Sequence, residues 1–224
     1  GAITGIVPCY RKTNSYGEYV FDHGWANAYA QAGGRYYPKL QVSIPFTPVT
    51  GRRFFSSSDA GRKTLADGLI ALCTEQNASS VHATFVTEDE WTALGGKRWL
   101  QRNDIQFHWH NPGYDSFDDF LKSLSSQKRK NIRKERASIA ANGITMHALT
   151  GSAIAERHWD AFYDFYMDTG ARKWGTPYLN REFFSLIGQS MADHILLVMA
   201  ERGGRLIAGA LNFIGSHALY GRNW

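Results

Sequence analysis

Two carboxylates and two imidazoles in the first half of the chain have side-chain types that can hold a cation or take up a proton. They are Glu18, Asp22, His108 and His110, and Tyr16 lies close to the first of them. Side chains of these kinds exchange protons with reacting groups in general acid–base catalysis. We expect Glu18 and His108 to act as catalytic groups, and we expect the other three residues to contact a substrate.

His108 and His110 are two residues apart in a stretch with the pattern of a strand, which would place both imidazoles on one face. The same spacing suits a metal ion, but a third ligand is not evident, so we expect no metal site. A structural role for the two rings, through hydrogen bonds, is as good an interpretation as substrate contact.

A loop between two predicted helices carries further candidates. Arg172, Lys173 and Trp174 lie between Gly170 and Gly175 and combine cations, an aromatic ring and a restricted backbone. Loops of this kind commonly carry function on a rigid scaffold, so we expect the three side chains to bind substrate. The alternative is an ordinary helix–helix connection.

A basic helix is predicted over residues 116–141, and six cations crowd its second half. Arg129, Arg133 and Arg136 fall on one helix face, next to the apolar stripe. We expect Arg129 and Arg133 to bind phosphate groups or a tRNA backbone. A solvated basic face near the helix C-terminus, where the helix dipole favours cations, explains the pattern equally well.

The elements that must position these residues alternate between strand and helix in the first half of the chain. The second half is expected to form a strand, two helices and an antiparallel meander over residues 195–224, with turns at its glycines. The meander is apolar on both faces, so we expect helices above and below it. The predicted first-half ranges are strands at 2–10, 37–46, 80–86 and within 97–110, and helices at 25–31, 59–75 and 88–94.

Composition limits the class of protein. The 224 residues are 43% hydrophobic, which supports a real core, and the net charge of +5 favours an anionic partner. No apolar run approaches the length of a transmembrane helix. The two cysteines form no disulfide framework or metal motif, which predicts a reducing, cytoplasmic location.

Four segments are similar to the FemAB-like family of GNAT-related proteins. SSQKRKNIRKERASIAANGI at 125–144 resembles the helix that opens the second GNAT-like domain of FemAB-type aminoacyltransferases. DTGARKWGTPYLNREFF at 168–184 resembles a loop and helix of the same group, and SYGEYVFD at 15–22 and QFHWHN at 106–111 resemble signatures of the first half. That bacterial family is usually described as involved in peptidoglycan biosynthesis or recognition.

The resemblance implies an α/β (α+β) fold of two GNAT-like modules, 1–112 and 113–224, with mixed sheets covered by helices and both outer ends truncated. It also implies acyl or aminoacyl transfer to an amine, which a peptidoglycan precursor could supply and which Glu18, Asp22, His108 and His110 would hold or deprotonate. The donor, acyl-CoA or aminoacyl-tRNA, stays open. In GNAT-like sheets the fourth strand lines the cleft. The resemblance therefore implies that Tyr220 donates to an oxyanion or leaving group and that Arg222 contacts the substrate. Core packing is an equal alternative for Tyr220.

Two other classes of function remain open. One is an RNA- or anionic-surface-binding module, although no RNP, KH or zinc-finger pattern occurs in the sequence. The other is a non-catalytic protein that recognises cell-wall peptide. Because residues 219–224 are expected to be the fourth strand, the donor-binding helix would lie beyond Trp224, and these 224 residues alone are expected not to turn over substrate.

Overall fold

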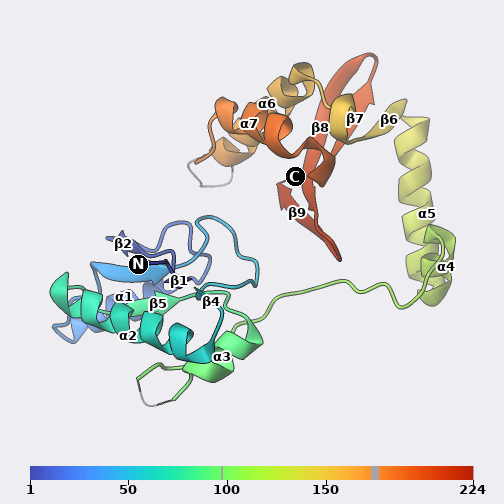
Figure 1. Ribbon diagram of the computed structural model, residues 1–224. Coiled ribbons are helices and arrows are strands. Elements are labelled where there is room, and N and C mark those ends of the chain that lie inside the picture. Colours follow the sequence, from blue (N-terminus) through green and yellow to red (C-terminus); the bar gives the residue numbers. More distant parts are fainter. Residues whose placement is uncertain (97, 173–176, 224) are drawn as a thin grey trace. The chain divides into compact units, whose positions relative to one another are not determined.

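The computed structural model describes residues 1–96, 98–172 and 177–223, and the chain divides into two compact units (Figure 1). Unit 1 spans Gly1–His108 and unit 2 spans Trp109–Trp224. The described residues form seven α-helices and three sheets, which confirms the mixed α+β class expected from the sequence. The predicted module boundary between residues 112 and 113 lies next to this division, and the identity of each unit as a GNAT-like module stays a prediction.

Unit 1 is built around a short mixed sheet in which β3 is the middle strand, antiparallel to β2 and parallel to β5. A second small sheet pairs β1 with β4. The core joins Val42 of β3 and Phe54 to Ala66 and Leu69 of α2. In chain order the elements are β1 (Gly5–Ile6), β2 (Tyr10–Lys12), α1 (His23–Gln31), β3 (Lys39–Val42), β4 (Phe55–Ser56), α2 (Asp59–Glu75), β5 (Val81–Ala83) and α3 (Glu88–Leu94).

Two strand predictions in unit 1 are corrected by the structure. The expected strand 2–10 is two short strands, β1 and β2, separated around Pro8, which has no backbone N–H to donate to a ladder. Among the described residues 98–110 there is no strand, although apolar and polar residues alternate there. An alternating pattern forms a strand only where another strand pairs with it, and Phe107 in this segment is 96% exposed.

Glu90 forms a capping box with Thr87 at the start of α3 and also links α3 to the chain before β4. Its buried carboxylate accepts hydrogen bonds from the N–H groups of Thr87 (3.2 Å), Arg53 (2.9 Å) and Phe54 (2.7 Å). One acid therefore satisfies backbone donors both at the start of a helix and in a distant part of the chain.

Unit 2 contains one antiparallel sheet in the order β6-β7-β8-β9, and the predicted meander is confirmed as β7, β8 and β9. This sheet is antiparallel throughout its described strands, whereas a mixed sheet was expected. Short 3₁₀ turns follow β6 and precede β7. The elements are α4 (Phe117–Ser123), α5 (Ser126–Ala141), β6 (Ile144–Leu149), α6 (Glu156–Arg172), α7 (Arg181–Met191), β7 (Ile195–Arg202), β8 (Arg205–Ile214) and β9 (Leu219–Asn223).

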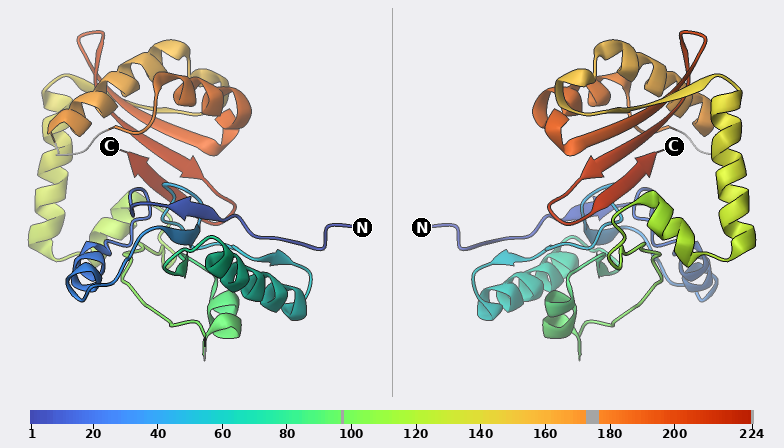
Figure 2. Two further views of the ribbon diagram at one scale, coloured as in Figure 1. Left: turned by 90° about the vertical axis from the view of Figure 1, so that its left-hand side faces the viewer. Right: turned by 90° about the vertical axis from the view of Figure 1, so that its right-hand side faces the viewer.

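Helices α6 and α7 lie on the same face of this sheet, as Figure 2 shows. The core there joins aromatic side chains of the helices, including Trp159 and Phe184, to Leu197 and Met199 of β7. The strand register puts Met146 on the opposite face, where it is 55% exposed. The expectation that helices cover both faces is therefore wrong for the described elements of unit 2, because both amphipathic helices use the same side.

The predicted helix 116–141 is also corrected, because it is two helices, α4 and α5, broken at Leu124 and Ser125. Ser116 and Ser125 cap the two helix starts, where each side chain accepts a hydrogen bond from a first-turn N–H group. Serine is among the residues best suited to this cap position, so Ser125 favours a new helix start over a continuous one.

Candidate functional site

A buried lysine organises the most polar part of the interior of unit 1. Lys39 begins β3, whose four residues are all buried, and its side chain is 0% exposed. Its ammonium donates to Glu18 Oε2 at 2.7 Å and to Asp22 Oδ2 at 2.8 Å. Because a buried charge is costly unless it is paired and hydrogen-bonded, these two carboxylates are what allow a lysine at this position.

Hydroxyl groups and aromatic rings complete the surroundings of the ammonium. Lys39 Nζ also donates to Ser15 Oγ at 2.7 Å, and the Tyr36 hydroxyl donates to Asp22 Oδ2 at 2.7 Å. The rings of Tyr36 and Tyr37 have their centroids 5.3 and 5.7 Å from Nζ, which is within the range of cation–π attraction. We call Lys39, Glu18, Asp22, Ser15, Tyr36 and Tyr37 the Lys39 cluster.

The loop that supplies the two carboxylates has an unusual backbone. Gly17, Tyr19 and Phe21 have φ values of 79°, 55° and 47°, in the left-handed region. Two of the three are bulky residues, for which this conformation is strained, and such strain persists only where surrounding contacts enforce it. Gly17 is required because an added Cβ would lie 2.7 Å from the Phe46 ring. The loop is thus folded tightly around the ammonium.

The two carboxylates ionise differently. Burial raises the pKa of Glu18 above its ordinary value, even though Lys39 opposes the shift. Burial also acts to raise the pKa of Asp22, but hydrogen bonds to Lys39, Ser15 and Tyr36 outweigh it and hold that pKa well below its usual range. Glu18 Oε1 and Asp22 Oδ1 are both buried and have no hydrogen-bond partner among the described residues.

His82 on β5 lies beside the cluster in its neutral form. Its ring packs edge-on against Tyr36, 5.7 Å between centroids, and Nε2 is 2.9 Å from Ser80 Oγ. Burial, reinforced by the nearby Lys39 charge, lowers the pKa of His82 to about 4. The histidine therefore adds no positive charge to the cluster at neutral pH.

The predicted amine-holding carboxylates thus hold an amine, that of Lys39 from the same chain. Glu18 and Asp22 were expected from the sequence, whereas Lys39 and Tyr36 were not. The pattern pointed the other way, because Lys39, Gln41 and Ser43 alternate with apolar residues in the predicted strand 37–46, which is typical of a strand with one solvated face.

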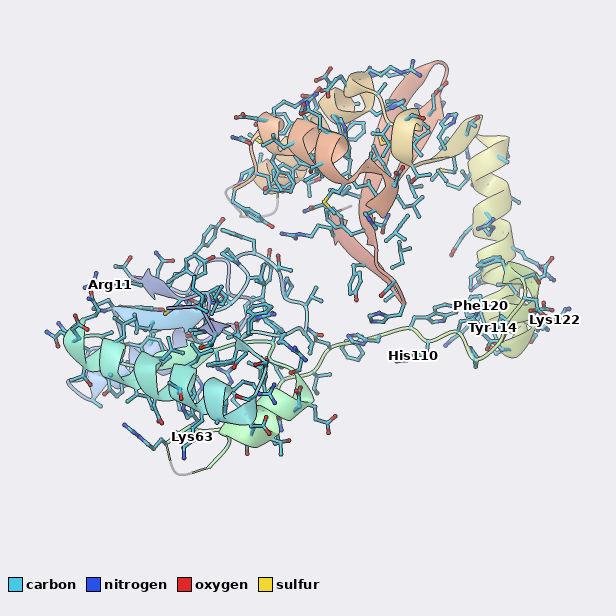
Figure 3. The ribbon with its side chains drawn as sticks, in the orientation of Figure 1. Arg11, Lys63, His110, Tyr114, Phe120 and Lys122 are labelled. Atoms are coloured by element: carbon cyan, nitrogen blue, oxygen red, sulfur yellow. The ribbon has the colours of Figure 1, made fainter. Side chains whose placement is uncertain are left out.

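The other first-half candidates are not among the six residues of the Lys39 cluster. The Tyr16 ring meets Phe46 edge-on at 5.6 Å. His108 and His110 are exposed on the irregular segment, so the expectation that they share a strand face is wrong. His108 Nε2 lies 3.3 Å from Gln106 Oε1, and Figure 3 shows His110 on the stretch leading to α4.

The arginine face of α5 is turned towards α4. Arg129 Nη1 donates to the carbonyl oxygens of Leu121, Lys122 and Leu124 at 3.5, 3.3 and 3.3 Å, which caps the end of α4. Arg133 pairs with Asp118 at 3.2 Å, and the Arg136 guanidinium lies 4.5 Å from the centroid of the Phe117 ring. These contacts support a structural role, and phosphate binding by Arg129 and Arg133 stays a prediction.

The remaining candidates belong to unit 2. Arg172 pairs with Asp168 one turn earlier on α6, and Lys173 and Trp174 lie outside the described residues. Arg222 of β9 donates to the Tyr178 hydroxyl and lies over its ring. Tyr220 is half-buried and pairs with Phe213 of β8 in the strand register. Its predicted role as a hydrogen-bond donor in catalysis stays a prediction.

The described part of the chain contains neither a candidate metal site nor a helix that could span a membrane. Within residues 1–96, 98–172 and 177–223, no three or more His, Cys, Asp or Glu side chains gather as a metal site would require. None of the helices described there is both long enough and apolar enough to cross a membrane. Cys9 and Cys73 are free thiols.

Comparison with known proteins gives one family. The sequence pattern of the FemAB-like family, described as peptidoglycan biosynthesis/recognition, matches residues 1–224. This match confirms the resemblance seen in the four sequence segments. No curated protein matches the chain.

Proposed function

We propose, because the chain belongs to the FemAB-like family, that the protein transfers an acyl or aminoacyl group to an amine in cell-wall peptide metabolism. The family description, peptidoglycan biosynthesis/recognition, supports a role in cell-wall peptide metabolism. The Lys39 cluster supports the chemistry, since Glu18 and Asp22 each bind Lys39 through one oxygen and keep a second, buried oxygen without a partner among the described residues. That pair of carboxylates is the observation that carries the proposal.

The reaction we propose begins with removal of a proton from the acceptor ammonium. Glu18 Oε1 takes this proton, and the neutral nitrogen then attacks the donor carbonyl to form the new C–N bond. The bond to the leaving group, a thiolate of CoA or a ribose alkoxide of tRNA, then breaks, and that group takes the proton that the attacking nitrogen releases as the amide forms. The roles of Tyr220 as a donor to an oxyanion or leaving group and of Arg222 as a substrate contact remain predictions that rest on the family resemblance.

The acceptor in this scheme is a peptidoglycan precursor with a primary amine, and the donor is an acyl-CoA or an aminoacyl-tRNA. We place the reaction in the cytoplasm, where both cysteines would remain the free thiols that the structure contains. Net positive charge suits either donor, because both carry phosphate groups.

An amide-forming assay on the complete protein tests the proposal. A lysine-containing stem peptide is incubated with acetyl-CoA or with alanyl-tRNA, and the product is detected by mass spectrometry. Glu18→Gln should lower kcat by about 10²-fold or more, with little change in acceptor affinity. Glu75→Gln, an exposed carboxylate at the end of α2, is the matched control and should retain activity.

Two results would count against the proposal. Acceptor binding without product from either donor would leave a recognition protein in place of a transferase. Equal rates for the Glu18→Gln and Glu75→Gln variants would remove Glu18 from the mechanism.

A further inference from the structure

The two carboxylates of the Lys39 cluster have unequal hydrogen-bonding surroundings. Asp22 Oδ2 accepts from Lys39 Nζ at 2.8 Å and from the Tyr36 hydroxyl at 2.7 Å. Glu18 Oε2 accepts from Lys39 at 2.7 Å, its one side-chain hydrogen bond among the described residues. When the surroundings of two acids differ in this way, one stays ionised and the other is able to exchange a proton.

The charges of the cluster do not balance when both acids are ionised. Two carboxylates face one ammonium, which leaves a single excess negative charge inside unit 1. The other charged or titratable groups facing Glu18 are Lys12 on β2 and the phenol of Tyr36. Lys39 is the cation in direct contact with Glu18, so its charge has the largest share in keeping that carboxylate ionised.

We infer that Lys39 is a positioning residue, which keeps Glu18 ionised and fixes its carboxylate so that Oε1 is the oxygen left to take a proton. This inference rests on the proposed function, because it assigns the residue that prepares the proposed base. Lys39 itself contacts neither reacting partner in the scheme. Asp22 is held ionised by its own hydrogen bonds and shares the ammonium with Glu18.

The inference predicts opposite effects for two substitutions that break the same ion pair. Lys39→Met removes the positive charge next to Glu18, so the Glu18 pKa should rise. Asp22→Asn removes a negative charge next to Glu18 and leaves Lys39 in place, so the Glu18 pKa should fall. A merely structural disturbance of the cluster would have no reason to move the pKa in opposite directions.

A carbon-13 NMR titration of glutamate side chains in the complete protein measures these shifts. The Glu18 signal is assigned by its loss in Glu18→Gln. We expect a rise of about one pH unit or more in Lys39→Met and a fall of about half a unit or more in Asp22→Asn. Tyr36→Phe is the control, because it removes a hydrogen bond from Asp22 without changing the charge, and Glu18 should move by less than about 0.3 unit.

Two outcomes of the NMR titration would overturn the inference. A Glu18 pKa that is unchanged or raised in Asp22→Asn overturns the inference, as does a shift in Tyr36→Phe equal to that in the charge variants. If Lys39→Met does not fold, Asp22→Asn and Tyr36→Phe decide the question alone.

Activity provides a separate readout. In a working transferase, the acid limb of the pH profile of kcat/KM should shift to higher pH in Lys39→Met, by the same amount as the pKa of Glu18 in the NMR titration. The expected NMR shifts without any amide formation would defeat the proposed function and leave the role of Lys39 intact. Amide formation whose acid limb does not follow the Glu18 titration would defeat the role of Lys39 and leave the function intact.

Discussion

In unit 1, the backbone conformation of several residues follows from the need to balance one buried charge, the ammonium of Lys39. Lys39 has no exposed side-chain surface, and Glu18 and Asp22 reach its ammonium from a loop with left-handed backbone at Tyr19 and Phe21. The cost of burying an ammonium without partners exceeds the cost of a few strained dihedral angles. The loop conformation is therefore a consequence of the lysine.

Stability should depend on pH through the two acids in opposite ways. The lowered pKa of Asp22 means that its contribution is present above the unfolded value of 3.8 and is lost as the pH falls through the folded value. The raised pKa of Glu18 means that its contribution is present below the unfolded value of 4.5 and is lost as the pH rises through the folded value.

Urea unfolding between pH 3 and pH 8 checks this difference. Relative to the unchanged protein, Glu18→Gln should gain stability as the pH rises from about 4.5 through the raised folded pKa of Glu18. The stability loss in Asp22→Asn should be complete and constant above about 3.8 and should shrink as the pH falls below that value, and each change should have a slope of at most about 1.4 kcal/mol per pH unit. Parallel stability curves for all three proteins would contradict the assignment of separate ionisation to the two acids.

At this scale, side-chain types predict part of the site. Glu18 and Asp22 could be chosen from the sequence because carboxylates are able to hold or deprotonate an amine and because both lie in the segment 15–22 that resembles the family. Lys39 could not, because only the pairing of β3 between β2 and β5 shows that this lysine is buried. His108 and His110 were misplaced because an alternating pattern does not show whether a neighbouring strand exists.

Elements in both units are joined by side chains that bind backbone groups. Two of the predicted helices have the expected bounds, because 59–75 and 88–94 agree with α2 and α3. The break between α4 and α5 was missed because the apolar stripe continues across it. Local capping by Ser125 prevailed over periodicity there.

Loss of the Glu90 carboxylate should destabilise unit 1. Glu90→Ala leaves the N–H groups of Arg53, Phe54 and Thr87 without their acceptor, at about 1–3 kcal/mol for each buried donor, so we expect a loss of about 3 kcal/mol or more. Chemical denaturation followed by tryptophan fluorescence measures it. Glu88→Ala, an exposed acid in the same helical turn, should cost less than about 1 kcal/mol, and equal losses would contradict the linking role.

The end of α4 should loosen when Arg129 is replaced. Arg129→Lys keeps the charge but loses the planar fork that reaches three carbonyl oxygens, so hydrogen exchange in α4 should quicken by about fivefold, equivalent to about 1 kcal/mol. Lys134→Gln on the opposite, exposed side of α5 serves as the comparison and should leave α4 unchanged. Matching behaviour of the two variants would remove the capping role.

The whole molecule has two separate cores, one in each unit. A substitution in one core should therefore change the stability of its own unit and leave pKa values in the other unit unchanged. Phe184 is fully buried in the core of unit 2, so Phe184→Ala should destabilise that unit by about 3–5 kcal/mol in thermal or urea unfolding. The Glu18 titration should remain unchanged under native conditions, because the Lys39 cluster lies wholly in unit 1. A shifted Glu18 pKa in this variant would show coupling between the units.

The shared ammonium of Lys39 also constrains how the sequence can change over generations. A lineage that loses Lys39 alone keeps two buried carboxylates without a counter-charge, and one that loses both acids keeps a buried cation. Substitutions at positions 18, 22 and 39 should therefore be inherited together. Related sequences with an uncharged residue at position 39 should have lost at least one of the two acids. Substitutions at these three positions are therefore expected to be correlated.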